Sequence, residues 1–256
     1  VPTQRAASTH AHILRSTLPY CTNLRELQLF VRPRDLYAVE ALNTFFAKTI
    51  APLPTIHLCC APPPLGDSVR DPMPVVTDVI REIASRRHLL HALSLDCCYT
   101  IGHAAAKELA TGLGPTLQRL ALDASLFQDW TVLASFPNLV ELRLQNTLMS
   151  DADLRRLLPH LPLLETFAVH QVSSITCAGL EPLARLHQLH TLEFSRCVGI
   201  ENEAVLALAR ISSLTTVRLV HIDVSASSLE ILVRDMGPRL ISLSVNAIST
   251  AHASSL

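Results

Sequence analysis

Eight histidine and cysteine residues with side chains suited to metal binding lie in two segments of the chain. They are His57, Cys59, Cys60, His88, His91, Cys97, Cys98 and His103. Imidazole nitrogens and thiolates are the ligands that Zn²⁺ takes in tetrahedral sites, and two neighbouring thiols can form a redox pair. The leading interpretation is ordinary packing and surface exposure of these side chains. Zinc binding and redox chemistry are the alternatives, and no cofactor or metal is predicted.

Sequence patterns that carry catalysis or phosphate binding do not occur in the chain. The stretch GLGPTL from Gly112 contains two of the seven glycines in the chain. It lacks the third glycine of a dinucleotide-binding loop, and it precedes an expected strand instead of following one. The G-x-x-x-x-G-K, H-E-x-x-H and G-x-S-x-G patterns are also missing. The sequence therefore predicts a protein that is not an enzyme.

A short apolar pattern recurs along the chain and would position the polar residues. The pattern is L-x-x-L-x-L, with Ile, Val or Phe replacing some leucines. Its copies begin at Leu24, Leu53, Leu90, Leu117, Leu139, Leu164, Leu189, Leu214 and Leu240. The last five starts are about 25 residues apart, within the range of roughly 20 to 29 residues for a leucine-rich coil. The last two apolar positions of each copy are two residues apart, as on one side of a β-strand.

The segments between these copies have the spacing of helices. From Asp151, the apolar residues of DADLRRLLPHL recur every three or four residues, with Ser150 or Asp151 as the N-cap. The segment SASSLEILVRDMG is expected to end at Gly237–Pro238, and SLFQDWTVLASFP to form a single turn near Trp130. The sequence thus predicts an α/β solenoid with a curved parallel sheet inside and helices outside, in about nine repeats.

Polar residues alternate with the apolar ladder and are expected on the exposed face of the sheet. The candidate partner-binding residues are Asp96, Arg119, Asp123, Glu141, Arg143, Gln145, His170, Glu193 and Arg218. Long hydrogen-bonding groups on a rigid sheet suit protein recognition, and Arg offers a fixed fork for carboxylates. Small neighbours such as Ala168 would leave room for a partner. The alternative is a face that is simply solvated.

The repeat that begins at Leu189 carries a family resemblance. Leu189, Leu192 and Phe194 are followed by Cys197 and Ile200, and Leu90, Leu93, Leu95 and Cys98 repeat the pattern. This resembles the cysteine-containing subclass of leucine-rich repeats, found in F-box substrate receptors of ubiquitin ligases. In other coils the cysteine position holds Ser125, Thr147, Val172, Ile222 and Ile248. The resemblance implies a single leucine-rich repeat domain over residues 1–256, with a lead-in at 1–23 and a Pro-rich insertion at 61–74.

Composition restricts the partners and the compartment. A formal net charge of −1 argues against nucleic-acid binding, and no apolar run is long enough for a membrane span. Seven cysteines without a dense terminal cluster indicate an intracellular protein, cytoplasmic by default. Three arginines before the first acidic residue keep a mitochondrial location as an alternative.

These observations predict a non-catalytic scaffold or adaptor that binds a protein partner within a multi-protein complex. A substrate receptor of a ubiquitin ligase is the first alternative, and a metal-binding or enzymatic protein is the second.

Overall fold

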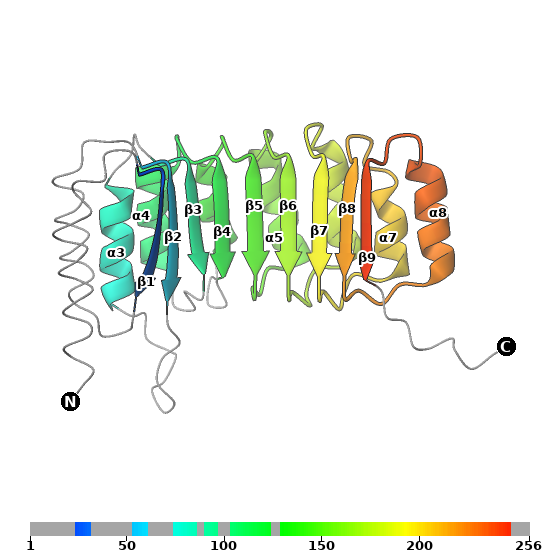
Figure 1. Cartoon of the computed structure of the whole chain (residues 1–256), viewed down its shortest axis with the longest axis horizontal. Coiled ribbons are helices and arrows are strands. Elements are labelled where there is room, and N and C mark those ends of the chain that lie inside the picture. The colour runs from blue at the N-terminus through cyan, green and yellow to red at the C-terminus, as the bar shows by residue number, and fades with distance from the viewer. Residues whose placement is uncertain are drawn as a thin grey trace, which may run out of the picture. The chain divides into compact units, whose positions relative to one another are not determined.

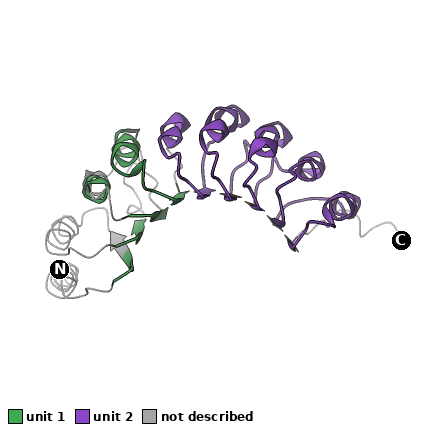
Figure 2. Cartoon of the chain, turned by 90° about the horizontal axis from the view of Figure 1, so that it is seen from above, with its two compact units in different colours: residues 1–127 green, residues 128–256 purple. Residues whose placement is uncertain are grey.

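The structure is a computed structural model that describes residues 24–31, 53–60, 74–85, 90–96, 103–123 and 129–246. The chain divides into two compact units, residues 1–127 and 128–256 (Figure 2). The lead-in at 1–23 and the Pro-rich insertion, except for Pro74, lie outside the described residues. A single domain over the whole chain therefore remains a prediction.

The first unit contains four parallel strands that pair in chain order. They are β1 (Glu26–Val31), β2 (Thr55–Cys60), β3 (Ala92–Asp96) and β4 (Arg119–Asp123). Two helices are described between them, α3 (Pro74–Ala84) and α4 (His103–Leu113), and they pack against each other. Helix α4 is not among the helices expected from apolar spacing, although its sequence HAAAKELATGL is rich in residues that favour helix formation.

The second unit repeats a strand-then-helix coil. Its strands are β5 (Glu141–Gln145), β6 (Thr166–His170), β7 (Thr191–Ser195), β8 (Thr216–Val220) and β9 (Ser242–Asn246). Its helices are α5 (Asp151–Leu157), α6 (Cys177–Leu180), α7 (Asn202–Leu208) and α8 (Ala226–Met236). Short 3₁₀ segments are η2 (Trp130–Ser135), η3 (Leu158–His160) and η4 (Glu181–Arg185).

Within the second unit, the strands lie on the inner side of an arc and the helices on its outer side (Figure 2). Neighbouring strands run parallel, as the arrows of Figure 1 show. Each of the nine predicted ladders forms a strand in the described part of the chain. The predicted strand–helix solenoid is therefore confirmed.

The apolar ladder forms the core because equivalent residues of successive coils are in register. Leu142 aligns with Phe167, then with Leu192 and Val217. All four side chains are fully buried. A single five-residue strand cannot bury its own apolar side, so each coil depends on its neighbours for stability.

Side-chain caps fix where the helices begin. Ser150 is the N-cap of α5, and Ser150 and Asp153 form a reciprocal capping box. Thr176 is the N-cap of α6, and its backbone N–H and hydroxyl donate hydrogen bonds to Asp151 of α5 at 2.8 and 2.6 Å. Helix α8 ends at Met236 with Gly237 as its C-cap, which agrees with the expected stop at Gly237–Pro238, and η2 forms the turn predicted near Trp130. The caps therefore join successive coils as well as starting helices.

Four strands are each followed by a residue with a left-handed backbone. These residues are Asn146, Gln171, Arg196 and His221, with φ between 51° and 55°. Their backbone N–H groups donate to carbonyls at the ends of the next strands, over 2.8 to 3.0 Å. The positive φ turns the chain out of the sheet while the hydrogen-bond ladder continues for one more residue.

The position occupied by cysteine in the resembled family is buried in the second unit. Thr147, Val172, Cys197 and Ile222 are all at most 4% exposed. Among the described residues, the Thr147 hydroxyl has no hydrogen-bond partner. A buried hydroxyl without a partner destabilises the folded state.

Replacement of this hydroxyl by a methyl group should therefore stabilise the protein. We expect Thr147→Val to raise the free energy of unfolding by about 1 kcal/mol, because the side chain keeps its shape and loses an unsatisfied polar atom. Urea denaturation of both proteins measures the difference. Thr216→Val, at a half-exposed position on β8, is the control and should change stability less. A less stable Thr147→Val variant would show that the hydroxyl is satisfied in solution.

Candidate functional site

The side of strands β5–β9 that faces away from the helices presents the polar residues that alternate with the ladder (Figure 2). We call this surface the sheet face. Glu141, Thr166, Thr191 and Thr216 align in a first row, and Arg143, Ala168, Glu193 and Arg218 align in a second. A third row contains Gln145, His170, Ser195 and Val220. All of these side chains are exposed or half-exposed except Ala168, which is fully buried.

Glu193 is at the centre of a group of charged side chains on the sheet face. Its Oε2 atom lies 4.0 Å from Nη1 of Arg143 and 3.7 Å from Nη1 of Arg218. Its other carboxylate oxygen lies 3.5 Å from Nε2 of His170. Arg143 also donates a hydrogen bond from Nε to Glu141. We call these five residues the sheet-face cluster: Glu141, Arg143, His170, Glu193 and Arg218.

The register explains how Arg143 reaches Glu193. Arg143 on β5 and Glu193 on β7 are separated by Ala168 on β6. The alanine side chain is short enough for the arginine to pass above it, and Ala168 is itself 0% exposed. The expectation that Ala168 leaves room for a partner is therefore wrong, since the Arg143 side chain uses that space.

His170 is half-buried between opposite charges. Burial lowers the pKa of His170 below its ordinary value, Glu193 raises it, and Arg143 lowers it again. The net direction is downward. The imidazole is therefore neutral at neutral pH, so the cluster contains two cations and two anions.

The three candidate partner-binding residues of the first unit differ from one another in exposure. Asp96 and Arg119 are exposed, and Asp96 accepts a hydrogen bond from Ser94 at 2.9 Å. Asp123, however, is only 4% exposed, which contradicts its expected position on an open surface. Alternation along a strand sets the side to which a residue points, but it does not determine what packs over that residue. We therefore remove Asp123 from the candidate surface.

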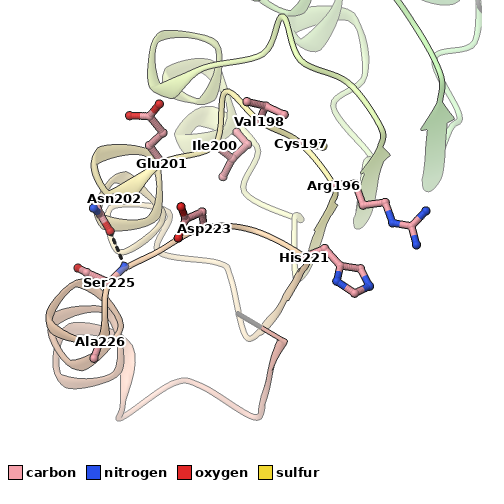
Figure 3. Close-up of a pocket in the computed structure, with 10 residues that line it drawn as sticks. All are labelled: Arg196, Cys197, Val198, Ile200, Glu201, Asn202, His221, Asp223, Ser225 and Ala226. Carbon is pink, nitrogen blue, oxygen red and sulfur yellow. Dashed lines mark hydrogen bonds between the residues drawn. The ribbon is translucent and has the colours of Figure 1, made fainter. Parts of the chain in front are cut away.

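A cavity of about 730 Å³ lies between the segments that follow β7 and β8 (Figure 3). Its lining residues are Arg196, Cys197, Val198, Ile200, Glu201, Asn202, His221, Asp223, Ser225 and Ala226. Asn202 accepts a hydrogen bond from the backbone N–H of Ser225 at 2.8 Å. In Figure 3 the side chains of Arg196 and His221 extend away from Glu201 and Asn202. The cavity therefore does not bring its acidic and basic groups together.

Cys197 is the cysteine of this cavity, and it is 2% exposed. Its Sγ atom lies 3.3 Å from the carbonyl oxygen of Val169 and 3.4 Å from that of Ser195, so the thiol can donate to either. Burial raises the pKa of the Cys197 thiol. A neutral, buried thiol is a packing residue and not a nucleophile.

The histidine–cysteine group of the first unit is described only in part. His57 lies 3.3 Å from Glu26, and His91 lies 3.4 Å from the carbonyl oxygen of Thr116. The side chains of Cys60, His88, Cys97, Cys98 and His103 lie outside the described residues. Among the residues that are described, no three His, Cys, Asp or Glu side chains are grouped to hold a metal ion.

Sequence reasoning missed two exposed basic residues near the sheet face, Arg196 and His221. Each directly follows a strand, where the alternation used to select candidates has ended. The signal was their spacing, because Asn146, Gln171, Arg196 and His221 recur at one position of successive coils.

One family model matches part of the chain. Residues 110–182 match the family described as FBD-associated F-box protein At5g56370, LRR repeats. This match covers less than a third of the chain. No curated protein sequence matches, and no helix in the described segments is long and apolar enough to cross a bilayer.

Two solved structures are similar to the chain. An internalin (inlF) from Listeria monocytogenes str. 4b F2365 is 13% identical, with a TM-score of 0.39. The similarity covers 95% of this chain and 88% of the internalin. A leucine-rich repeat protein of Leptospira interrogans is 15% identical, with a TM-score of 0.48. This similarity covers 87% of this chain. It covers 49% of the Leptospira protein, so the chain spans about half of that protein's length.

Proposed function

Because the chain is a leucine-rich repeat protein, we propose that it is a non-catalytic scaffold or adaptor that binds a protein partner through the sheet face. The observation that carries this proposal is the sheet-face cluster, in which five long polar side chains lie together on a rigid parallel sheet. Because the strands of the sheet are held in register by their hydrogen bonds, the backbone that carries these side chains loses little entropy on binding. Mixed charge also favours specificity between proteins.

Blocking the sheet face with bulky side chains tests this proposal whatever the charge of the partner. We expect Ser195→Trp combined with Ser244→Trp to reduce partner capture at least tenfold, since misplaced bulk at an interface centre separates the two surfaces. Affinity purification of the full-length protein from its source cells, with quantitative mass spectrometry, measures the capture.

Two exposed positions on the helical side provide a matched control. Ala152 on α5 and Ala184 on η4 can receive the same two tryptophans. We expect this control to retain the partners that the sheet-face variant loses, with similar thermal midpoints for both. Equal capture by the two variants would contradict binding through the sheet face.

A second candidate function is supported by the family match. The matched model describes repeats of an F-box protein, which suggests that the chain is the substrate-binding part of a ubiquitin ligase receptor. Size-exclusion chromatography of the full-length protein with the ligase adaptor that binds F-boxes discriminates the two functions. A stable complex would support the function as a ubiquitin ligase receptor, and separate elution of the two proteins would exclude that function.

A further inference from the structure

The charged groups of the sheet-face cluster are arranged in two levels. The side chains of Arg143 and Arg218 are 45% and 51% exposed. Those of Glu141 and Glu193 are 25% and 14% exposed. The cluster is balanced in formal charge, but an approaching partner meets mainly the two guanidinium groups.

Most of the arginine donors in the cluster are uncommitted. Arg218 donates no hydrogen bond to a described residue, and its contact with Glu193 is an ion pair at 3.7 Å. Arg143 uses Nε for Glu141, which leaves its two terminal nitrogens free of hydrogen bonds to the described residues. Both guanidinium groups converge on one oxygen of Glu193, so a single ligand segment can contact both.

We propose that the partner presents an acidic segment, rich in Asp or Glu, whose carboxylates bind Arg143 and Arg218. This inference rests on the proposed function, whose protein partner it describes in more detail. Paired N–H donors of a guanidinium match the two oxygens of a carboxylate. Arg196, exposed at the end of β7, adds positive charge near the same surface.

Other charged partners fit this surface less well. A basic segment would place its cations over two guanidinium groups, whose compensating carboxylates lie beneath them. A nucleic acid would be bound mainly through lysine and arginine contacts along its phosphate backbone. The sheet face provides Arg143 and Arg218, with Arg196 beside it, and the whole chain has a net charge of −1. An acidic peptide therefore matches the surface best.

The test measures binding of short labelled peptides to the full-length protein by fluorescence anisotropy at low salt. The probes are a glutamate–serine repeat, the matching lysine–serine and glutamine–serine repeats, and an oligothymidine. We expect the glutamate probe to bind most tightly. We expect Arg143→Gln combined with Arg218→Gln to weaken its binding at least tenfold. Equal binding of all peptides, or tighter binding of the oligothymidine, would overturn the proposal.

A matched control removes two arginines from the helical side of the same unit. Arg156 on α5 and Arg210 after α7 are exposed. Their replacement by Gln changes the net charge equally, so we expect less than a twofold change in affinity. A loss equal to that of the sheet-face variant would assign the binding to net charge and overturn the proposed site.

Glu193→Gln provides a test of opposite sign. It keeps the shape of the side chain and removes the carboxylate that competes for both arginines, so we expect the glutamate probe to bind about threefold tighter. Unchanged or weaker binding would count against the proposal. A second outcome separates this inference from the proposed function. If no peptide probe binds preferentially to the sheet face while the tryptophan variant still loses its cellular partners, the inference that the partner presents an acidic segment is wrong, and the proposed binding of a protein through the sheet face stands.

Discussion

Phe194→Ala should lower the free energy of unfolding by about 3–5 kcal/mol, the range for truncation of a buried phenylalanine. Phe194 is 0% exposed and aligns with Val169 on β6 and Leu219 on β8. Truncation would leave a cavity between two neighbouring coils. Because each coil is held only by its neighbours, the cavity weakens both interfaces of β7.

Urea denaturation followed by circular dichroism measures this effect. Val198→Ala is the control, because Val198 is 78% exposed and lies four residues further along the chain. We expect the control to change stability by less than about 0.5 kcal/mol, as is usual for exposed positions. If the two variants were equally stable, Phe194 could not be part of a stacked apolar column.

The same alternation explains why most of the fold could be predicted from the sequence. Leu192 and Phe194 are buried while Glu193 between them is partly exposed, and Val217, Arg218 and Leu219 repeat this alternation in the next coil. A period of two residues fixes the strand, and a repeat of about 25 residues fixes which residues become neighbours. The apolar residues that recur every three or four positions predicted Ser150 or Asp151 as the N-cap of this helix, and Ser150 has that role.

The candidate site was less predictable, because the same pattern does not describe packing between side chains. Arg143 and Glu193 were both placed on the sheet face, yet their meeting depends on the short side chain of Ala168 between them. The sequence also could not show that Asp123 is covered while Asp96 is exposed. Such differences arise from the shape of neighbouring side chains, which periodicity does not contain.

The segments that connect strand to helix depend on close backbone contacts, and Gly199 is the position where this is most evident. A Cβ atom added to Gly199 would clash with the backbone carbonyl oxygen of Ile175 and lie 3.0 Å from that of Ser173. Both oxygens belong to the preceding coil. Because backbone atoms cannot rotate away as a side chain can, the two coils would have to separate.

We therefore expect Gly199→Ala to destabilise the protein by about 1–3 kcal/mol, the usual cost of overpacking. The direction of the change in stability is informative. At a position with space for a methyl group, Gly→Ala stabilises proteins by about 0.4–1 kcal/mol, because alanine reduces the conformational entropy of the unfolded chain. Thermal and urea denaturation measure the change, with Val198→Ala as a control in the same segment. A stabilised Gly199→Ala variant would mean that successive coils are not in backbone contact at this position. Such a result would also contradict the fixed register that brings Arg143, Glu193 and Arg218 together on the sheet face.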